Sequence, residues 1–197
     1  MGASTTGPRV SADTFERLYE RDVDPWGYDS RAYEREKYAA TLAALGARSY
    51  GRALELGCSI GAFTELLSSR CGALTALDFS PRAVALARAR TRLLTNVTIR
   101  EAAFPEQVPA GSWDLVVCSE VLYYLDRATL ERALDWLDMQ LRGAAVVIAV
   151  SWRGSARTEP LTGDEVHERL TARFASSHAL TGLHPGYRLD RFDGATA

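Results

Sequence analysis

Residues 53–63 read Ala-Leu-Glu-Leu-Gly-Cys-Ser-Ile-Gly-Ala-Phe, and this stretch decides the fold of the chain. The apolar residues before Gly57 are typical of a buried parallel strand, and Gly57 and Gly61 let the backbone turn sharply beside a ligand before a helix begins. A second apolar run, 73–77, ends at Asp78, 21 residues after Gly57. A carboxylate there can accept both hydrogen bonds of a ribose diol. The pattern predicts a nucleotide-binding turn.

Two positions depart from the dinucleotide-binding fingerprint. Ser59 stands in place of the second glycine, and Glu55 lies two residues before the first. A carboxylate so close to the turn repels phosphates, but it attracts a cationic amino-acid group directly or through water. These departures point away from a pyrophosphate ligand.

The series Glu-x-Gly-Cys-Ser-x-Gly at 55–61, followed by Leu-Asp-Phe-Ser at 77–80, resembles the cofactor site of class I S-adenosylmethionine-dependent methyltransferases. Segments 24–38 (DPWGYDSRAYEREKY) and 119–125 (SEVLYYL) are similar to those of the nodulation protein S-like N-methyltransferases, which act on the free amine of a chitooligosaccharide. The similarity covers roughly residues 14–150. It implies S-adenosylmethionine as cofactor, S-adenosylhomocysteine as product and an amine of an amino sugar or other natural product as small-molecule acceptor.

Strand and helix patterns alternate along the chain, which requires a parallel sheet. The expected strands are 53–57, 73–78, 97–102, 113–118 and 144–150, and the expected helices are 61–70, 81–92, 129–141 and 162–174. A closing hairpin is expected at 177–180 and 187–192. By the resemblance, this hairpin is the antiparallel edge of an α/β, Rossmann-like, doubly wound and mostly parallel seven-stranded sheet.

The domain organisation expected is a single methyltransferase domain over residues 12–197, after a disordered segment 1–11. Within it, residues 12–46 form a helical lid over the substrate, in two pieces broken at 24–27, where proline and glycine force a turn. Residues 47–197 form the cofactor-binding core.

The resemblance places the cofactor along the carboxyl ends of the strands. The turn residues line it, Asp78 holds the ribose and Phe79 lies against the adenine. Ala103 and Phe104 stand where relatives often have an acidic residue for the adenine amine, so backbone groups and the Phe104 ring are expected to serve instead. The predicted cofactor contacts are Glu55, Gly57, Cys58, Ser59, Gly61, Asp78, Phe79, Ala103, Phe104 and Ser119. The alternative is an ordinary tight turn with a surface aspartate.

The acceptor side is predicted from the residues that follow the fourth strand and from the aromatic segment before the first. Glu120 can accept a proton or orient an ammonium group, and Tyr124 stands where many class members have a histidine. The predicted catalytic residues are Glu120 and Tyr124, and the predicted substrate contacts are Trp26, Tyr28, Tyr33 and Tyr123. The alternative is that Glu120 only caps a helix and the tyrosines belong to the core.

Three other functions stay open. O-methylation of a small metabolite needs stronger base assistance, and a non-catalytic module would bind the cofactor without transfer. Gly57 to Gly61 also fits Gly-x-Ser-x-Gly, the nucleophile elbow of α/β-hydrolases with Ser59 as nucleophile. That fold needs an oxyanion loop before the elbow, and no His-Gly-Gly-type segment precedes residue 57.

Composition limits the partners. With 197 residues, a formal charge of −2 and a pI near 6.0, the chain has no electrostatic footprint for nucleic acid or an anionic membrane. The three cysteines have no paired spacing, which indicates reduced thiols in the cytoplasm. The three histidines are scattered, so no metal site is expected, and His167 among charged neighbours is expected on a solvated helix face. The sequence does not indicate an oligomeric state.

Overall fold

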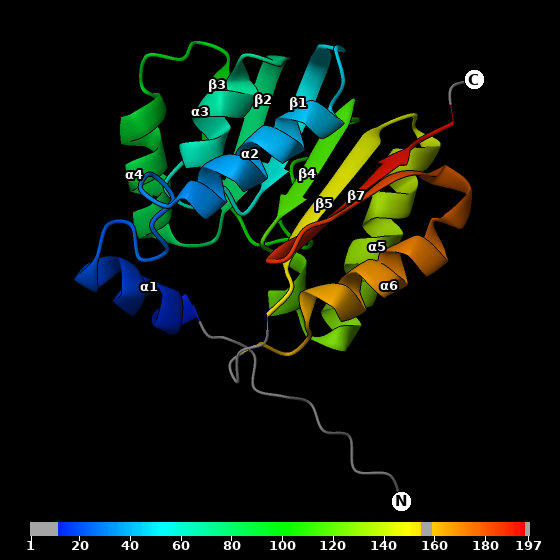
Figure 1. Ribbon diagram of the computed structural model, residues 1–197. Helices are drawn as coiled ribbons and strands as arrows, with labels where there is room; N and C mark the ends of the chain where they lie inside the picture. Colours follow the sequence, from blue (N-terminus) through cyan, green and yellow to red (C-terminus); the bar gives the residue numbers. More distant parts are fainter. Residues whose placement is uncertain (1–11, 155–158, 196–197) are drawn as a thin grey trace, which may run out of the picture.

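The computed structural model describes residues 12–154 and 159–195 (Figure 1). The strands are β1 (Tyr50–Leu56), β2 (Cys71–Asp78), β3 (Val97–Glu101), β4 (Leu115–Ser119), β5 (Val146–Trp152), β6 (His178–Leu183) and β7 (Tyr187–Asp193). The α-helices are α1 (Ala12–Arg21), α2 (Ala32–Ala44), α3 (Ala62–Ser68), α4 (Pro81–Thr91), α5 (Arg127–Arg142) and α6 (Gly163–Arg173), and two 3-10 turns are η1 (Leu122–Tyr124) and η2 (Ala175–Ser177). The expected segment 1–11 lies outside the described residues.

The strands form one seven-stranded sheet in the order β3-β2-β1-β4-β5-β7-β6. The pairs from β3 to β5 are parallel, whereas β7 pairs antiparallel with both β5 and β6. The strand order reverses between β1 and β4, so the carboxyl ends of these two strands flank the point where open α/β sheets bind ligands. The predicted doubly wound fold and its antiparallel closing hairpin are confirmed.

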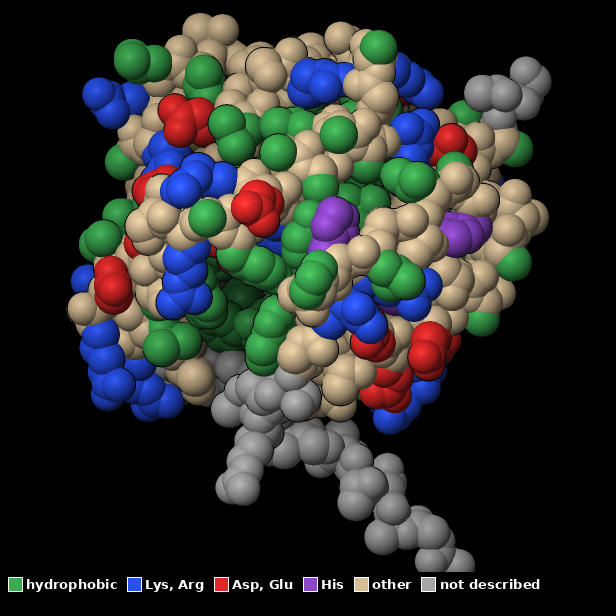
Figure 2. All heavy atoms as spheres, in the orientation of Figure 1, with side chains coloured by type: hydrophobic (Ala, Val, Ile, Leu, Met, Phe, Trp, Pro, Cys, Tyr) green, Lys and Arg blue, Asp and Glu red, His purple; other side chains and the backbone are tan. Residues whose placement is uncertain are grey.

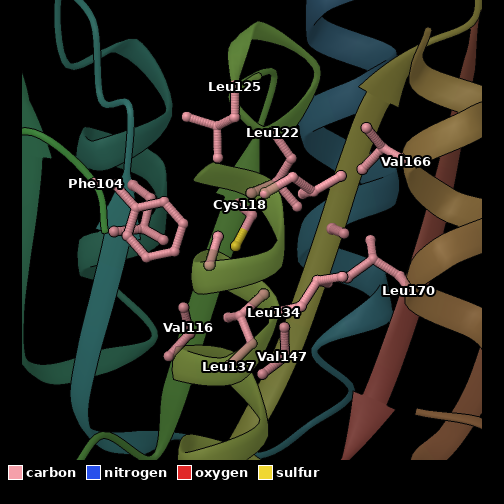
Figure 3. Packing of buried hydrophobic residues seen from close by; sticks show 14 of the residues in the cluster. Phe104, Val116, Cys118, Leu122, Leu125, Leu134, Leu137, Val147, Val166 and Leu170 are labelled. Carbon is pink, nitrogen blue, oxygen red and sulfur yellow. The ribbon is translucent and has the colours of Figure 1, made fainter. Parts of the chain in front are cut away.

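Helices cover both faces of the sheet, because alternate residues of each strand point to opposite sides. Helices α2, α3 and α4 pack on one face through Tyr38, Phe63 and Ala83. The other face is covered by α5 and α6, and Figure 3 shows Leu134 and Leu137 of α5 meeting Val116 of β4 and Val147 of β5. The predicted break between the first two helices is also present, since α1 ends at Arg21 and α2 begins at Ala32.

Helix α4 begins as the sequence predicts. Ser80 is the N-cap, its Oγ accepts a hydrogen bond of 3.1 Å from Ala83 N, and Pro81 occupies the first helical position. The cap fixes where the chain leaves β2, so Asp78 and Phe79 lie at the edge of the sheet where the ligand is expected.

His167 does not lie on a solvated face, and that expectation is wrong. The side chain is fully buried on α6, and its Nδ1 is hydrogen-bonded to Asp190 of β7. Arg188 donates to the same carboxylate at 2.8 Å. Charged neighbours along the helix misled the prediction, since the partner of His167 comes from a strand 23 residues later. Within the described residues this cluster ties α6 to the sheet.

Candidate active site

A cavity of about 800 Å³ opens at the carboxyl ends of the parallel strands. Figure 2 shows a hollow with largely hydrophobic walls on this side of the molecule, beside α1 and α2. A volume near the upper end of the range for small-ligand pockets, roughly 300–1,000 Å³, leaves room for a cofactor together with a small acceptor. All the predicted site residues line the cavity except Gly61, which begins α3 against Ala87 of α4.

The turn after β1 needs its glycine. Gly57 has a φ of +74°, and a Cβ at this position would lie 2.1 Å from Val121 Cγ2. Ser59 also adopts a left-handed conformation, with φ of 50°. The N–H groups of Gly57 and Cys58 both donate to Leu77 O at 2.8 Å. The turn is therefore fixed to the end of β2, and its backbone forms one wall of the cavity.

Asp78 joins this turn to the start of α4. Its Oδ2 accepts a hydrogen bond from Ser59 N and its Oδ1 accepts one from Ser80 N, both at 2.9 Å. Burial raises the pKa of the Asp78 carboxyl to about 6. Each carboxylate oxygen keeps a second lone pair, so the group can still accept two hydroxyl donors.

Glu55 is a buried acid of the cavity that has an unpaired carboxylate oxygen among the described residues. The side chain is buried, it lines the cavity, and its Oε2 has no hydrogen-bond partner. Burial raises the pKa of its carboxyl to about 7. A buried acceptor without a donor is costly, so this position favours a ligand that brings a cationic or N–H donor.

The part of the cavity where the adenine is expected is lined by Phe79, Ala103 and Phe104. Phe79 is 38% exposed, whereas Phe104 is buried against Trp136. The side chain of Gln107, which the sequence did not single out, accepts a hydrogen bond of 2.8 Å from Ala103 N. A ligand that uses this amide has to displace Gln107.

Helix α1 covers the turn after β1. The sequence predicted a helix here but not which of its residues contact the turn. Tyr19 OH is hydrogen-bonded to Ser59 Oγ, and Glu16 is hydrogen-bonded to Ser80 Oγ. Phe15 packs edge-on against both Phe79 and Tyr124, with ring centroids 5.2 and 5.1 Å apart. The available signal was the four-residue spacing of Phe15 and Tyr19, which places both on one face of a helix.

Glu120 is held by three donors where the chain leaves β4. Its Oε1 accepts from Lys37 Nζ at 2.8 Å, and its Oε2 accepts from Tyr123 OH at 2.7 Å and from Trp152 N at 2.9 Å. Lys37 is buried and also pairs with Glu34 at 2.9 Å. The backbone of Glu120 is left-handed, with φ of 57°. The three donors, one of them the Lys37 cation, fix the position of the Glu120 carboxyl group at the cavity.

The other predicted acceptor residues line the same cavity. Tyr124 packs on Tyr123 with ring centroids 4.5 Å apart, and burial raises the pKa of the Tyr124 phenol to about 12. Trp26 and Tyr28 stack against each other at 5.7 Å on the turn before α2. The two phenols of η1 therefore stay protonated at neutral pH, and the ring faces supply an apolar wall.

The described residues provide no hydrolase site. None of the three histidines lines the cavity, so Ser59, which is hydrogen-bonded to Tyr19, has no neighbouring base.

No group of three or more metal-binding side chains occurs in the part of the chain that the structure describes. In the same part, no helix is long and apolar enough to span a membrane.

Comparison with known proteins settles the family. The sequence model of the family described as nodulation protein S (NodS) matches residues 11–160. The chain belongs to the NodS family. Nodulation protein S of Bradyrhizobium diazoefficiens is 36% identical over 157 residues, which are 76% of this chain and 72% of that protein.

Solved structures agree with the family assignment. The NodS N-methyltransferase of Bradyrhizobium japonicum WM9 in complex with S-adenosylhomocysteine matches with a TM-score of 0.81 and 28% identity, over 94% of this chain and 98% of that one. A putative methyltransferase from Pseudomonas syringae matches with a TM-score of 0.72 and 36% identity, over 83% and 99% of the two chains. This member of the NodS family is therefore an S-adenosylmethionine-dependent methyltransferase with a Rossmann-like fold.

The residues of the cavity fit that cofactor. Glu55 offers a carboxylate oxygen without a partner to an ammonium group, and Asp78 retains acceptor capacity for two ribose hydroxyls. Gly57 keeps the turn free of a side chain. The described residues at the turn include the carboxyl groups of Glu55 and Asp78 and no cationic side chain. The turn therefore does not suit a pyrophosphate.

Proposed function

We propose that this methyltransferase acts in the cytoplasm on an amine of a small acceptor of the amino-sugar or natural-product type. The observation that carries the proposal is the ion-pair cluster that lines the acceptor half of the cavity. There, the carboxyl groups of Glu34 and Glu120 both pair with the ammonium group of Lys37, at 2.9 and 2.8 Å. Two carboxyl groups that share one cation complement the ammonium group of an acceptor. The buried free thiols of all three cysteines support a reducing compartment.

The proton chemistry of the cavity also favours nitrogen over oxygen. An amine needs only to lose its ammonium proton before it attacks, whereas a hydroxyl group needs a stronger base. The described part of the cavity has no histidine, and its lysine is paired with two carboxylates. Glu120 is the proposed site for the ammonium, while Tyr123 and Tyr124 shape the space around it.

The chain also contributes to methyl transfer by aligning the two reactants and by excluding water from them. Bound S-adenosylmethionine supplies a methyl group that its sulfonium makes electrophilic. Glu55, Cys58, Ser59, Asp78 and Ser119 are proposed to fix the cofactor, with Phe79, Ala103 and Phe104 beside the adenine. Trp26, Tyr28 and Tyr33 cover the acceptor, so the reacting atoms are held in line and away from water.

Three matched sugars test the proposal. D-glucosamine has a free amine, N-acetyl-D-glucosamine has the same ring with the amine blocked, and D-glucose has hydroxyl groups only. Formation of S-adenosylhomocysteine is expected with D-glucosamine alone. Equal transfer to D-glucose would establish O-methylation instead, and transfer to simple aliphatic amines but not to D-glucosamine would exclude the amino-sugar class.

Cofactor binding is expected to weaken in mild acid. Asp78 has a folded-state pKa raised from 3.8 to about 6, so it takes up a proton as the pH falls through 6 and then offers fewer acceptor sites to the ribose. One pH unit below this value, the affinity for S-adenosylhomocysteine should be about tenfold lower. The stability of the unliganded fold changes in the opposite direction, because protonation removes the cost of a buried charge between about pH 6 and pH 4.

Calorimetry between pH 7.5 and 5, with Asp78→Asn as the control, measures this effect. Glu55 titrates in both proteins, so the difference between the two profiles reports Asp78. Parallel profiles would contradict the prediction.

A further inference from the structure

The turn between β6 and β7, residues 184–186, lies beside the acceptor half of the cavity although it lines no part of it. Tyr33, which does line the cavity, donates its hydroxyl hydrogen to Gly186 O at 3.0 Å. The Tyr33 ring also meets the Tyr187 ring edge-on, with centroids 5.9 Å apart. Residues separated by 153 positions in the chain are therefore in direct contact behind the wall of the cavity that Tyr33 forms.

The same turn is fixed from a second side. Arg153, directly after β5, donates its backbone N–H to Gly186 O at 3.0 Å. The residue before it, Trp152, donates its backbone N–H to Glu120. The position of the turn and the position of the Glu120 carboxylate are thus set by two consecutive peptide groups.

Lys37 closes a ring of contacts. Its Nζ lies 5.2 Å from the centroid of the Tyr33 ring and 2.8 Å from Glu120 Oε1. The ring runs from Glu120 through residues 152–153, Gly186, Tyr33 and Lys37 back to Glu120. Lys37 is the one lysine of a chain whose other 22 basic residues are arginine. A shift of Tyr33 therefore changes both the width of the acceptor space and the cation that holds Glu120.

We propose that the 184–186 turn determines acceptor specificity by positioning Tyr33. Gly186 is the residue through which it does so. A Cβ at Gly186 would lie 2.6 Å from Tyr33 Cε2, and the edge of an aromatic ring cannot yield without moving the whole ring. The φ of Gly186 is not in the left-handed region, so alanine brings this contact without backbone strain.

The turn also lies outside the segment that the NodS family model matches, which ends at residue 160. The cofactor turn and the Glu120 segment are within that segment, whereas the part that positions Tyr33 is not. Members that share the same chemistry can therefore differ in acceptor through this hairpin. The inference rests on the proposed function for its amine probe.

Gly186→Ala tests the proposal, with Gly182→Ala of β6 as the matched control. A Cβ at Gly182 would lie 3.5 Å from its nearest neighbour, an ordinary contact. With D-glucosamine as acceptor, Gly186→Ala should raise the KM for the sugar at least tenfold. The dissociation constant of S-adenosylhomocysteine should stay within twofold, and Gly182→Ala should leave both constants unchanged. An unchanged KM, or a KM and a dissociation constant that rise together, would overturn the proposal.

If Gly186→Ala does not fold, Tyr33→Phe is the variant that tests the proposal. It removes the hydroxyl bond to Gly186 O without adding volume, and a rise in KM of about threefold to tenfold is expected. Failure of the amine proposal is recognised separately, because it shows in the wild-type protein as transfer to D-glucose, and the same order of KM values is expected with whichever acceptor the wild type uses. A crystal structure of Gly186→Ala with S-adenosylhomocysteine needs no acceptor. A displaced Tyr33 ring supports the proposal, and an unmoved ring overturns it.

Discussion

Replacement of Asp78 by alanine is expected to weaken the binding of S-adenosylhomocysteine about a hundredfold or more. The carboxylate is proposed to accept a hydrogen bond from each ribose hydroxyl, and each charge-assisted bond contributes about 1.5–3 kcal/mol. The lower limit for two such bonds, ~3 kcal/mol, corresponds to about two orders of magnitude in the dissociation constant. The variant also loses the two bonds from Ser59 N and Ser80 N that hold the turn against α4.

Asp114 provides the matched control. Its carboxylate likewise accepts a backbone hydrogen bond, from Arg52 N at 2.7 Å, but it precedes β4 at the opposite edge of the sheet from the cavity. Asp114→Ala should therefore affect stability and not affinity. Calorimetry on both variants separates the two effects, and an unchanged dissociation constant in folded Asp78→Ala would remove the role given to Asp78.

The geometry of the turn after β1 and of the start of α4 was predictable because local backbone requirements encode it. A left-handed turn requires glycine at 57, an N-cap requires a short polar side chain at 80, and the end of a parallel strand places Asp78 at the ligand-binding edge. Each of these requirements depends on residues within a few positions of one another. The alternation of strands and helices likewise indicates a parallel sheet.

The acceptor half depends on contacts that no local pattern encodes. Lys37 and Glu120 are 83 positions apart, and Tyr33 and Gly186 are 153 apart. The sequence placed Tyr33 and Glu120 at the site by chemical type and position, but it gave no sign that one carboxylate would receive three donors. Such pairings follow from how α2 packs onto the sheet and how the β6–β7 hairpin extends its edge, and that is a property of the whole fold.

Replacement of Glu120 by glutamine is expected to lower the turnover number about a hundredfold and to leave the affinity for S-adenosylhomocysteine unchanged. Glutamine preserves the shape of the side chain and removes its charge, so an ammonium bound there loses both its counter-ion and its proton acceptor. A positioned general base contributes roughly 10²–10⁴ in rate, and the lower limit applies here because three donors already share the carboxylate.

Tyr123→Phe separates the charge of Glu120 from its anchoring. This variant removes one of the three donors and keeps the carboxyl group, so the turnover number should fall less than tenfold. Steady-state kinetics of both variants between pH 6 and 9 make the comparison. If Glu120→Gln keeps full turnover over that range, Glu120 handles no proton, and alignment with exclusion of water carries the reaction. If both variants lose turnover equally, the carboxylate acts by holding η1 and β5 in place, because only that role is shared by the two substitutions.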